Sequence, residues 1–212
     1  MKFQDRTDAG RQLAESFKVA DPANTVILAL PRGGIPLAIE IALKFGAVLD
    51  VINAKKIAHP YQREYAIGAL AEQGEPIYNQ TEKQRIDADW LTQEVEQIRM
   101  EIQSRRALYN QLLTQQSLEG RDVIIVDDGI ATGLTMYAAV KAVKEAKPRS
   151  LAVAVPIIPQ DTFRELERLV DQVYYLEVPE RFKGAVGAYF VSFPQLTNDE
   201  IRMMLAAYKE EE

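Results

Sequence analysis

The chain has 212 residues, of which 47% are hydrophobic, and a formal net charge of −6. Its length and composition predict one folded domain over residues 1–212, and the acidic balance argues against a broad nucleic-acid surface. The absence of cysteine excludes disulfides and thiolate chemistry, and the single histidine, His59, excludes metal sites built from several imidazoles.

The N-terminal stretch MKFQDRTDAGRQLAE is too polar for a signal peptide. No apolar run approaches the roughly 18 residues that a membrane span requires. We therefore expect a cytoplasmic protein that binds neither a membrane nor nucleic acid.

Helical and strand patterns alternate along the chain, and this order predicts an α/β fold with a doubly wound, mostly parallel sheet. The predicted elements are, in chain order, a helix at 7–19, a strand at 25–30, a helix opened by Pro36, a strand at 47–53, an excursion at 55–80, a helix at 87–116, a strand at 123–126, a helix at 134–146, a strand at 150–155, a helix at 162–169, a strand at 172–178 and a helix at 198–208. The acidic end, 210–212, is expected to be disordered.

Two segments depart from the simple alternation. Residues 55–80 lose the apolar rhythm and carry Pro60, Gly68, Gly74 and Pro76, which predicts an excursion from the sheet such as a small hairpin hood. The long helix predicted at 87–116 has apolar positions at alternating steps of four and three residues. This spacing fits a helix that packs on the sheet, and it also fits a dimer seam.

The stretch VIIVDDGIATGLT, from Val123 to Thr135, combines three features. Its apolar start is typical of a buried parallel strand, and Asp127 and Asp128 follow at the strand end where such sheets bind ligands. The small-residue turn Gly129 to Thr135 precedes a helix, where backbone N–H groups and the helix dipole favour a phosphate. Because carboxylates repel phosphate, the pair is expected to face hydroxyls or hydrated Mg²⁺. A phosphorylated ribose diphosphate offers all of these groups.

VIIVDDGIATGLT resembles the phosphoribosyl-pyrophosphate (PRPP) motif of type I phosphoribosyltransferases. ALPRGGIPLA, at Ala29 to Ala38, is similar to the diphosphate loop of that family, and segment 55–80 matches its flexible hood. The segments FQDRTDAGRQLA, HPYQREYAIGAL and VPERFKGAVGAYFVSFPQLTNDEI resemble a bacterial subgroup of uncharacterised phosphoribosyltransferases. The resemblance implies an Mg²⁺-dependent enzyme of nucleotide salvage, commonly a homodimer, that transfers the phosphoribosyl group of PRPP to a nitrogen base or amine and releases diphosphate.

The resemblance also implies a role for each matching residue. The 5-phosphate would be bound by Ala131, Thr132, Gly133, Leu134 and Thr135, and the diphosphate by Arg32, Gly33, Gly34 and Lys55. Asp127 and Asp128 would hold the ribose hydroxyls and, through water, Mg²⁺. These two acids and Lys56, which would add positive charge as diphosphate leaves, form the expected catalytic group.

Several residues bear on the identity of the acceptor. Members of the family that act on hypoxanthine or guanine carry an acid where this chain has Ala131, which argues against a 6-oxopurine substrate. Tyr189, Phe190 and Phe193 could stack on a base, although core packing also explains them. His59 and Glu64 fit a solvated surface, or a hood that brings them to the site on closing.

Two alternatives to this enzyme are considered. A PRPP-binding regulator or sensor without turnover would keep the sugar-phosphate site. A P-loop hydrolase with VIIVDD as its acidic strand is disfavoured, because the chain has no G-x-x-x-x-G-K-[ST] sequence.

Overall fold

The structure is a computed structural model, and it describes residues 2–211. Its central sheet has five parallel strands in the order β2-β1-β6-β7-β8, so the predicted α/β fold with a doubly wound parallel sheet is confirmed. The strands are β1 (Thr25–Ala29), β2 (Val48–Val51), β6 (Asp122–Val126), β7 (Ser150–Ile157) and β8 (Gln172–Glu177).

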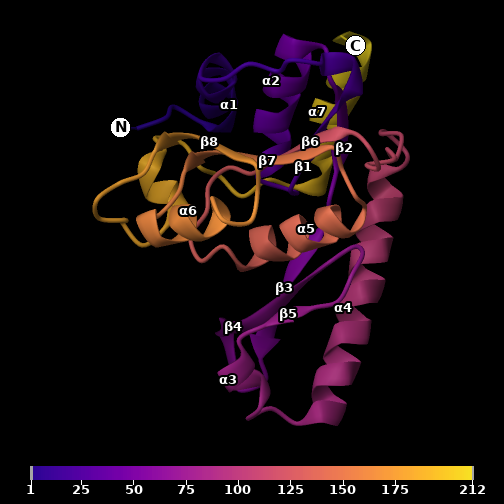
Figure 1. Cartoon of the computed structure of the whole chain (residues 1–212), viewed down its shortest axis with the longest axis vertical. Helices are drawn as coiled ribbons and strands as arrows, with labels where there is room; N and C mark the ends of the chain where they lie inside the picture. The colour runs from indigo at the N-terminus through magenta and orange to yellow at the C-terminus, as the bar shows by residue number, and fades with distance from the viewer. Residues whose placement is uncertain (1, 212) are drawn as a thin grey trace.

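Helices cover both faces of this sheet (Figure 1). One face carries α1 (Arg6–Glu15), α2 (Gly34–Phe45) and α7 (Asn198–Glu211), and the other carries α5 (Leu134–Glu145) and α6 (Gln160–Leu166). Two short 3-10 helices, η1 (Pro22–Asn24) and η2 (Val186–Tyr189), complete this part of the chain. The acidic end is helical through Glu211, so the predicted disorder is wrong for Glu210 and Glu211, and Glu212 lies outside the described residues.

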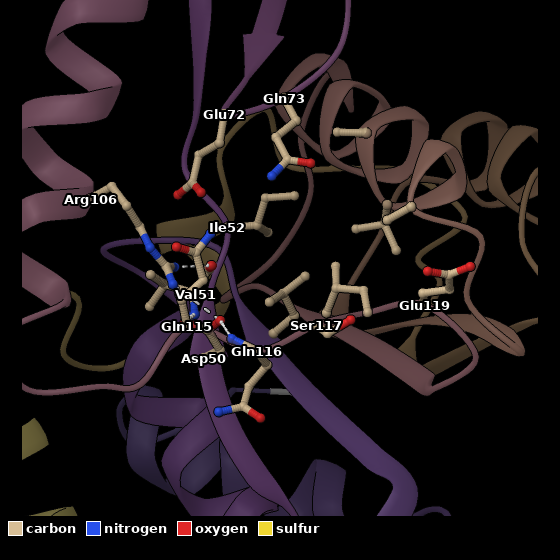
Figure 2. Close-up of a pocket in the computed structure, with 15 residues that line it drawn as sticks. Asp50, Val51, Ile52, Glu72, Gln73, Arg106, Gln115, Gln116, Ser117 and Glu119 are labelled. Carbon is tan, nitrogen blue, oxygen red and sulfur yellow. Dashed lines mark hydrogen bonds and ion pairs between the residues drawn. The ribbon is translucent and has the colours of Figure 1, made fainter.

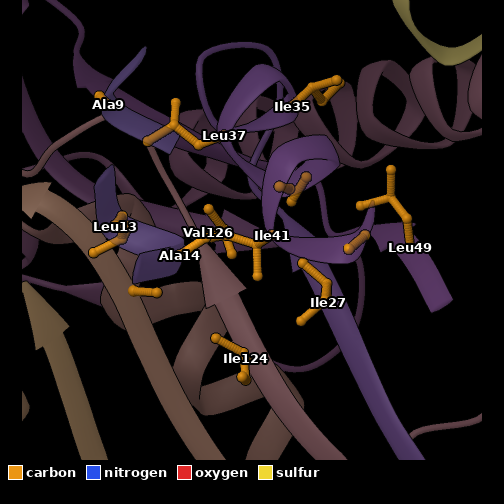
Figure 3. Close-up of a cluster of buried hydrophobic side chains, with 14 of the residues drawn as sticks. Ala9, Leu13, Ala14, Ile27, Ile35, Leu37, Ile41, Leu49, Ile124 and Val126 are labelled. Carbon is orange, nitrogen blue, oxygen red and sulfur yellow. The ribbon is translucent and has the colours of Figure 1, made fainter. Parts of the chain in front are cut away.

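Each face of the sheet buries its own apolar cluster. Ile27 and Ile124 point to the side of α1 and α2, where they pack with Leu13 and Ile41 (Figure 3). Their neighbours along the same strands point the other way, toward α5. Because every residue of β1 is buried, its run of apolar residues after Thr25 suits it better than alternation with polar residues would.

The hood is a second, antiparallel sheet that extends beyond α5 (Figure 1). It consists of β3 (Ala54–His59), β4 (Gln62–Ala71) and β5 (Ile77–Tyr78), followed by the short helix α3 (Gln80–Lys83). The position of the excursion agrees with the prediction, but it holds three strands where a small hairpin was expected.

The long helix α4 (Ala88–Tyr109) packs most of its apolar face on the hood, and its last turn contacts the central sheet through Arg106 and Tyr109. Its apolar residues Leu91, Val95 and Ile98 pack with Ile57 and Leu70 of the hood strands. The predicted helix was too long at its end: the chain leaves the helix after Asn110 and follows the edge of the central sheet. There Gln116 donates its backbone N–H to Asp50 of β2, at 2.9 Å.

Candidate active site

The acid pair lies directly after β6, at the carboxyl edge of the sheet. The Asp127 backbone N–H donates to Ala154 O of the neighbouring strand at 3.3 Å, which extends the sheet by one residue. Its carboxylate accepts the Asp128 backbone N–H at 2.8 Å. The strand end therefore fixes the backbone of both acids.

The loop after the acid pair ends in a helix start that is open to an anion. Gly133 precedes α5 with a φ of 76°, a left-handed conformation that glycine adopts without strain. The first helical bond runs from Tyr137 N to Gly133 O at 2.8 Å. The N–H groups of Leu134, Thr135 and Met136 therefore have no acceptor within the helix.

A cavity of about 150 Å³, here called the loop cavity, brings part of the predicted site together, whereas Asp128 and the PRGG loop lie outside its described walls. Its walls are Asp127, the loop residues Gly129 to Thr135 except Leu134, and three residues from other elements: Lys56 from the hood, Met136 from α5 and Val186 from η2. An acid, a cation and a phosphate-type loop thus face one space.

The PRGG loop packs against the acid pair from the side of β1. Leu30 N donates to Val126 O at 2.8 Å, and the peptide bond between Pro31 and Arg32 is cis. A Cβ atom on Gly33 would overlap the Asp128 carboxylate, and one on Gly34 would overlap the carbonyl oxygen of Val126 at the end of β6. Glycine is required at both positions because the two loops approach so closely.

Arg6 is a site residue that sequence reasoning missed. Its Nε donates to Asp128 Oδ2 at 2.7 Å, and its Nη1 donates to Pro194 O at 2.7 Å. Its guanidinium lies 3.7 Å from the centre of the Phe193 ring, in cation–π geometry. The Arg6 and Asp128 side chains are only 11% and 14% exposed. An arginine 122 residues away in sequence thus holds one of the two acids.

The electrostatics of the acid pair follow from this packing. Burial and the neighbouring Asp128 carboxylate raise the pKa of Asp127 well above its usual value. Burial also raises the pKa of Asp128, and the Arg6 guanidinium partly offsets that rise. Positive charge brought to Asp127 by a ligand or a metal would therefore stabilise its ionised form.

The residues present fit an Mg²⁺ ion that is held largely by phosphate groups and water. Asp127 and Asp128 supply oxygen ligands, which Mg²⁺ prefers. Within residues 2–211, no three His, Cys, Asp or Glu side chains gather closely enough to hold a metal by themselves. One or two carboxylates beside a phosphate loop match the usual way in which Mg²⁺ is bound together with phosphates and water.

The other predicted residues lie outside the described walls of the loop cavity. Lys55 pairs with Glu101 of α4, and Arg32 donates weakly to Asn198 Oδ1 at 3.5 Å. Leu134 opens α5 just outside the loop cavity. His59 lies near the hood tip, and Glu64 is exposed there on β4.

The three aromatic residues near the end of the chain have different environments. Tyr189 and Phe190 belong to the buried core. Phe193 lies next to the acid pair, through its contact with Arg6. Core packing therefore accounts for the first two.

The comparisons with known proteins agree with this geometry. The sequence profile of the phosphoribosyl transferase domain family matches residues 6–187. A protein of Mycobacterium tuberculosis, named provisionally as a phosphoribosyl transferase, is 36% identical over 201 residues, which cover 94% of this chain and 45% of that protein. The chain thus spans less than half the length of this relative.

The crystal structure of the protein TT1426 from Thermus thermophilus is similar over its whole length. It is 35% identical, it matches with a TM-score of 0.81, and the match covers 98% of this chain and 99% of that one. No helix within residues 2–211 is long and apolar enough to cross a membrane. The fold, the profile match over most of the chain and the arrangement of the site lead to one conclusion: this chain belongs to the phosphoribosyltransferase family.

Proposed function

We propose that the protein transfers the 5-phosphoribosyl group of PRPP to a nitrogen base or amine, with Mg²⁺, and releases diphosphate. The loop cavity is the observation that carries this proposal, because Asp127, the phosphate-type loop and Lys56 face the same space. Each of these groups matches a different part of PRPP. A cytoplasmic setting, a homodimer and a place in nucleotide salvage remain predictions that accompany the proposal.

The 5-phosphate would bind at the start of α5. The backbone N–H groups of Leu134 and Thr135 and the hydroxyls of Thr132 and Thr135 are the donors there, and the helix dipole favours the negative charge. The ribose hydroxyls would then lie against Asp127 and Asp128. Carboxylates accept hydrogen bonds from hydroxyls, and this explains why acids lie beside a phosphate site.

The diphosphate would extend toward the PRGG loop and Lys56. In the reaction, the bond between the ribose C1 and the diphosphate oxygen breaks while the acceptor nitrogen forms a bond to C1, and the acceptor loses a proton. Bound Mg²⁺ would neutralise charge on the departing diphosphate. Lys56 and Arg32 would add cationic stabilisation, and hood closure would exclude water.

The acceptor site would lie beside Val186 and Gly129, since these residues close the loop cavity on the side of the C-terminal segment. Ala131 offers no carboxylate to a purine at this position. A 6-oxopurine is therefore expected to be a poor acceptor.

Diphosphate release tests the proposal. The protein is incubated with PRPP, Mg²⁺ and one acceptor at a time from a panel of nucleobases and amines, and the ribosylated product is identified by mass. Release that requires both an acceptor and Asp127 would support the transferase. PRPP binding without release from any acceptor would contradict it and would favour a sensor.

A further inference from the structure

A second cavity, here called the hinge cavity, lies where the hood joins the central sheet. Its volume is about 310 Å³, and the residues described in its walls are all different from those of the loop cavity. They include Val51 and Ile52, where the chain leaves the sheet for the hood, Glu72 and Gln73, in the turn between β4 and β5, and residues 115–119, where the chain returns from α4 to the sheet (Figure 2). An occupant would therefore touch both connections of the hood. A cavity of this volume is large enough for a small ligand.

One wall of the hinge cavity is a buried ion pair with an unsatisfied donor. Arg106 of α4 pairs with Asp50 at 2.9 Å and donates to Val51 O at 2.7 Å. Arg106 is only 8% exposed, and within residues 2–211 its Nε has no hydrogen-bond partner. A buried donor without an acceptor is unfavourable, and an ordered water beside it would relieve that cost.

The charged side chains in the wall of the hinge cavity favour a cationic ligand over an anionic one. Asp50, Glu72 and Glu119 provide three carboxylates, and among the described wall residues Arg106, which Asp50 already engages, is the one cation. Only one oxygen of Glu72 has a described partner: its Oε1 accepts the backbone N–H of Asn53 at 2.8 Å and the side-chain amide at 2.5 Å. An anion such as a phosphate would be repelled here, whereas an amine or amidine would be attracted.

The opposite wall is apolar. Leu28 and Ile52 line it from the sheet side, and Ala142, Val143 and Ala146 line it from α5 and its end. Small side chains there leave room for a compact apolar group. The cavity therefore has carboxylates that can bind a cationic head group and an apolar surface that can pack against a short apolar body.

We propose that the hinge cavity binds a small amine or amidine with a compact apolar body, and that its occupant holds the hood against the central sheet. The cationic head would lie toward Glu72, and the apolar body would lie against α5. This inference does not rest on the proposed reaction, because the wall residues described for the two cavities are separate sets.

Three probes with one skeleton and different charge test the proposal. Benzamidine, benzamide and benzoate are titrated into the protein, and binding is followed by NMR chemical shifts. Saturable binding is expected for benzamidine, weaker binding for benzamide and none for benzoate. Absence of saturable benzamidine binding, or equal binding of benzoate, would overturn the proposal.

Substitutions in the wall of the hinge cavity test whether benzamidine binds there. Glu72→Gln keeps the side-chain shape and removes the charge, so benzamidine is expected to bind about tenfold more weakly. Glu75→Gln makes the same charge change outside the cavity wall and is expected to bind benzamidine as the wild type does. Ser117→Leu, at an exposed position that lines the cavity, should reduce binding by occupying space, and it decides the test if Glu72→Gln fails to fold. Unchanged binding in every folded cavity variant would contradict the assignment.

Discussion

At the scale of single residues, the site depends on contacts between segments that are distant in sequence. Asp128 is held by Arg6 on one side and is packed against Gly33 on the other. The strand, the acid pair and the phosphate loop could be predicted because they lie within one short stretch, Val123 to Thr135. The Arg6 contact could not, because a single sequence carries no signal that pairs residue 6 with residue 128. The segment FQDRTDAGRQLA stood out only through its resemblance to relatives.

Arg6 is expected to position Asp128 for the ribose hydroxyls. Arg6→Met should weaken PRPP binding about tenfold or more, because a hydrogen bond to a charged group is lost. Arg6→Lys should recover part of the affinity. The matched control is Arg11→Met, since Arg11 lies on the same helix in an exposed pair with Glu40. Equal PRPP affinity in Arg6→Met and Arg11→Met would contradict the positioning role.

Substitutions of the neighbouring residues Lys55 and Lys56 are expected to lower kcat by different amounts. Lys56 lines the loop cavity, whereas Lys55 pairs with Glu101 on α4. Because stabilising charge on the leaving group is worth about two orders of magnitude in typical sites, Lys56→Met should lower kcat about 10- to 100-fold. Lys55→Met should have a clearly smaller effect. Steady-state diphosphate release measures both, and a larger loss for Lys55→Met would reverse the assignment.

At the scale of elements, apolar patterns predicted the types of most segments and their order. They did not predict which element packs against an apolar face, because the pattern of one segment does not identify its neighbour. The apolar stripe of α4 predicted a packed face, but only the structure shows that Ile57 and Leu70 of the hood cover it. The sequence of β4 lacks the alternation of apolar and polar residues that predicts a strand, because its first residues are exposed and its last ones are buried on both faces. The helix α4 ends earlier than predicted because Leu113 is buried in the core of the central sheet and Asp50 accepts the backbone N–H of Gln116.

Arg106 ties α4 to the sheet, and its loss should destabilise the fold. Arg106→Met leaves Asp50 buried without its partner, and such a change costs about 3–5 kcal/mol. The control is Arg105→Met, on the neighbouring residue of the same helix. Chemical denaturation at neutral pH measures both variants, and equal stability would contradict the role of the ion pair.

The same variant should show a characteristic pH dependence. Burial raises the pKa of Asp50, and the attraction of Arg106 opposes that rise, so removing Arg106 raises the pKa further. A carboxyl group with a raised folded-state pKa stabilises the protein below that pKa and loses this contribution as the pH increases through it. The stability deficit of Arg106→Met should therefore be largest at neutral pH and shrink on acidification toward the raised pKa. A deficit that grows on acidification would contradict this explanation.

At the scale of the whole molecule, the chain consists of a sheet that carries the site and a hood that supplies Lys56 from outside it (Figure 1). The hood has its own small apolar cluster with α4, and its tip exposes Tyr61 to 90%. Such an arm can move as a unit while its strands stay paired. That the hood closes over PRPP is a prediction of this account.

Limited proteolysis tests that closure. Chymotrypsin should cut at the hood tip, after Tyr61 or Tyr65, because these rings are exposed. With PRPP and Mg²⁺ the same cuts should be several times slower, while cleavage of an unrelated unfolded protein in the same tube stays unchanged. Equal cutting with and without PRPP would mean that the hood does not close.

Binding of PRPP with Mg²⁺ at the acid pair is tested most directly by calorimetric titration of PRPP into the protein with and without Mg²⁺, repeated with Asp128→Asn. We expect saturable binding that Mg²⁺ strengthens and that the substitution weakens in the folded variant. Absence of PRPP binding by the folded wild-type protein in the presence of Mg²⁺ would contradict the account.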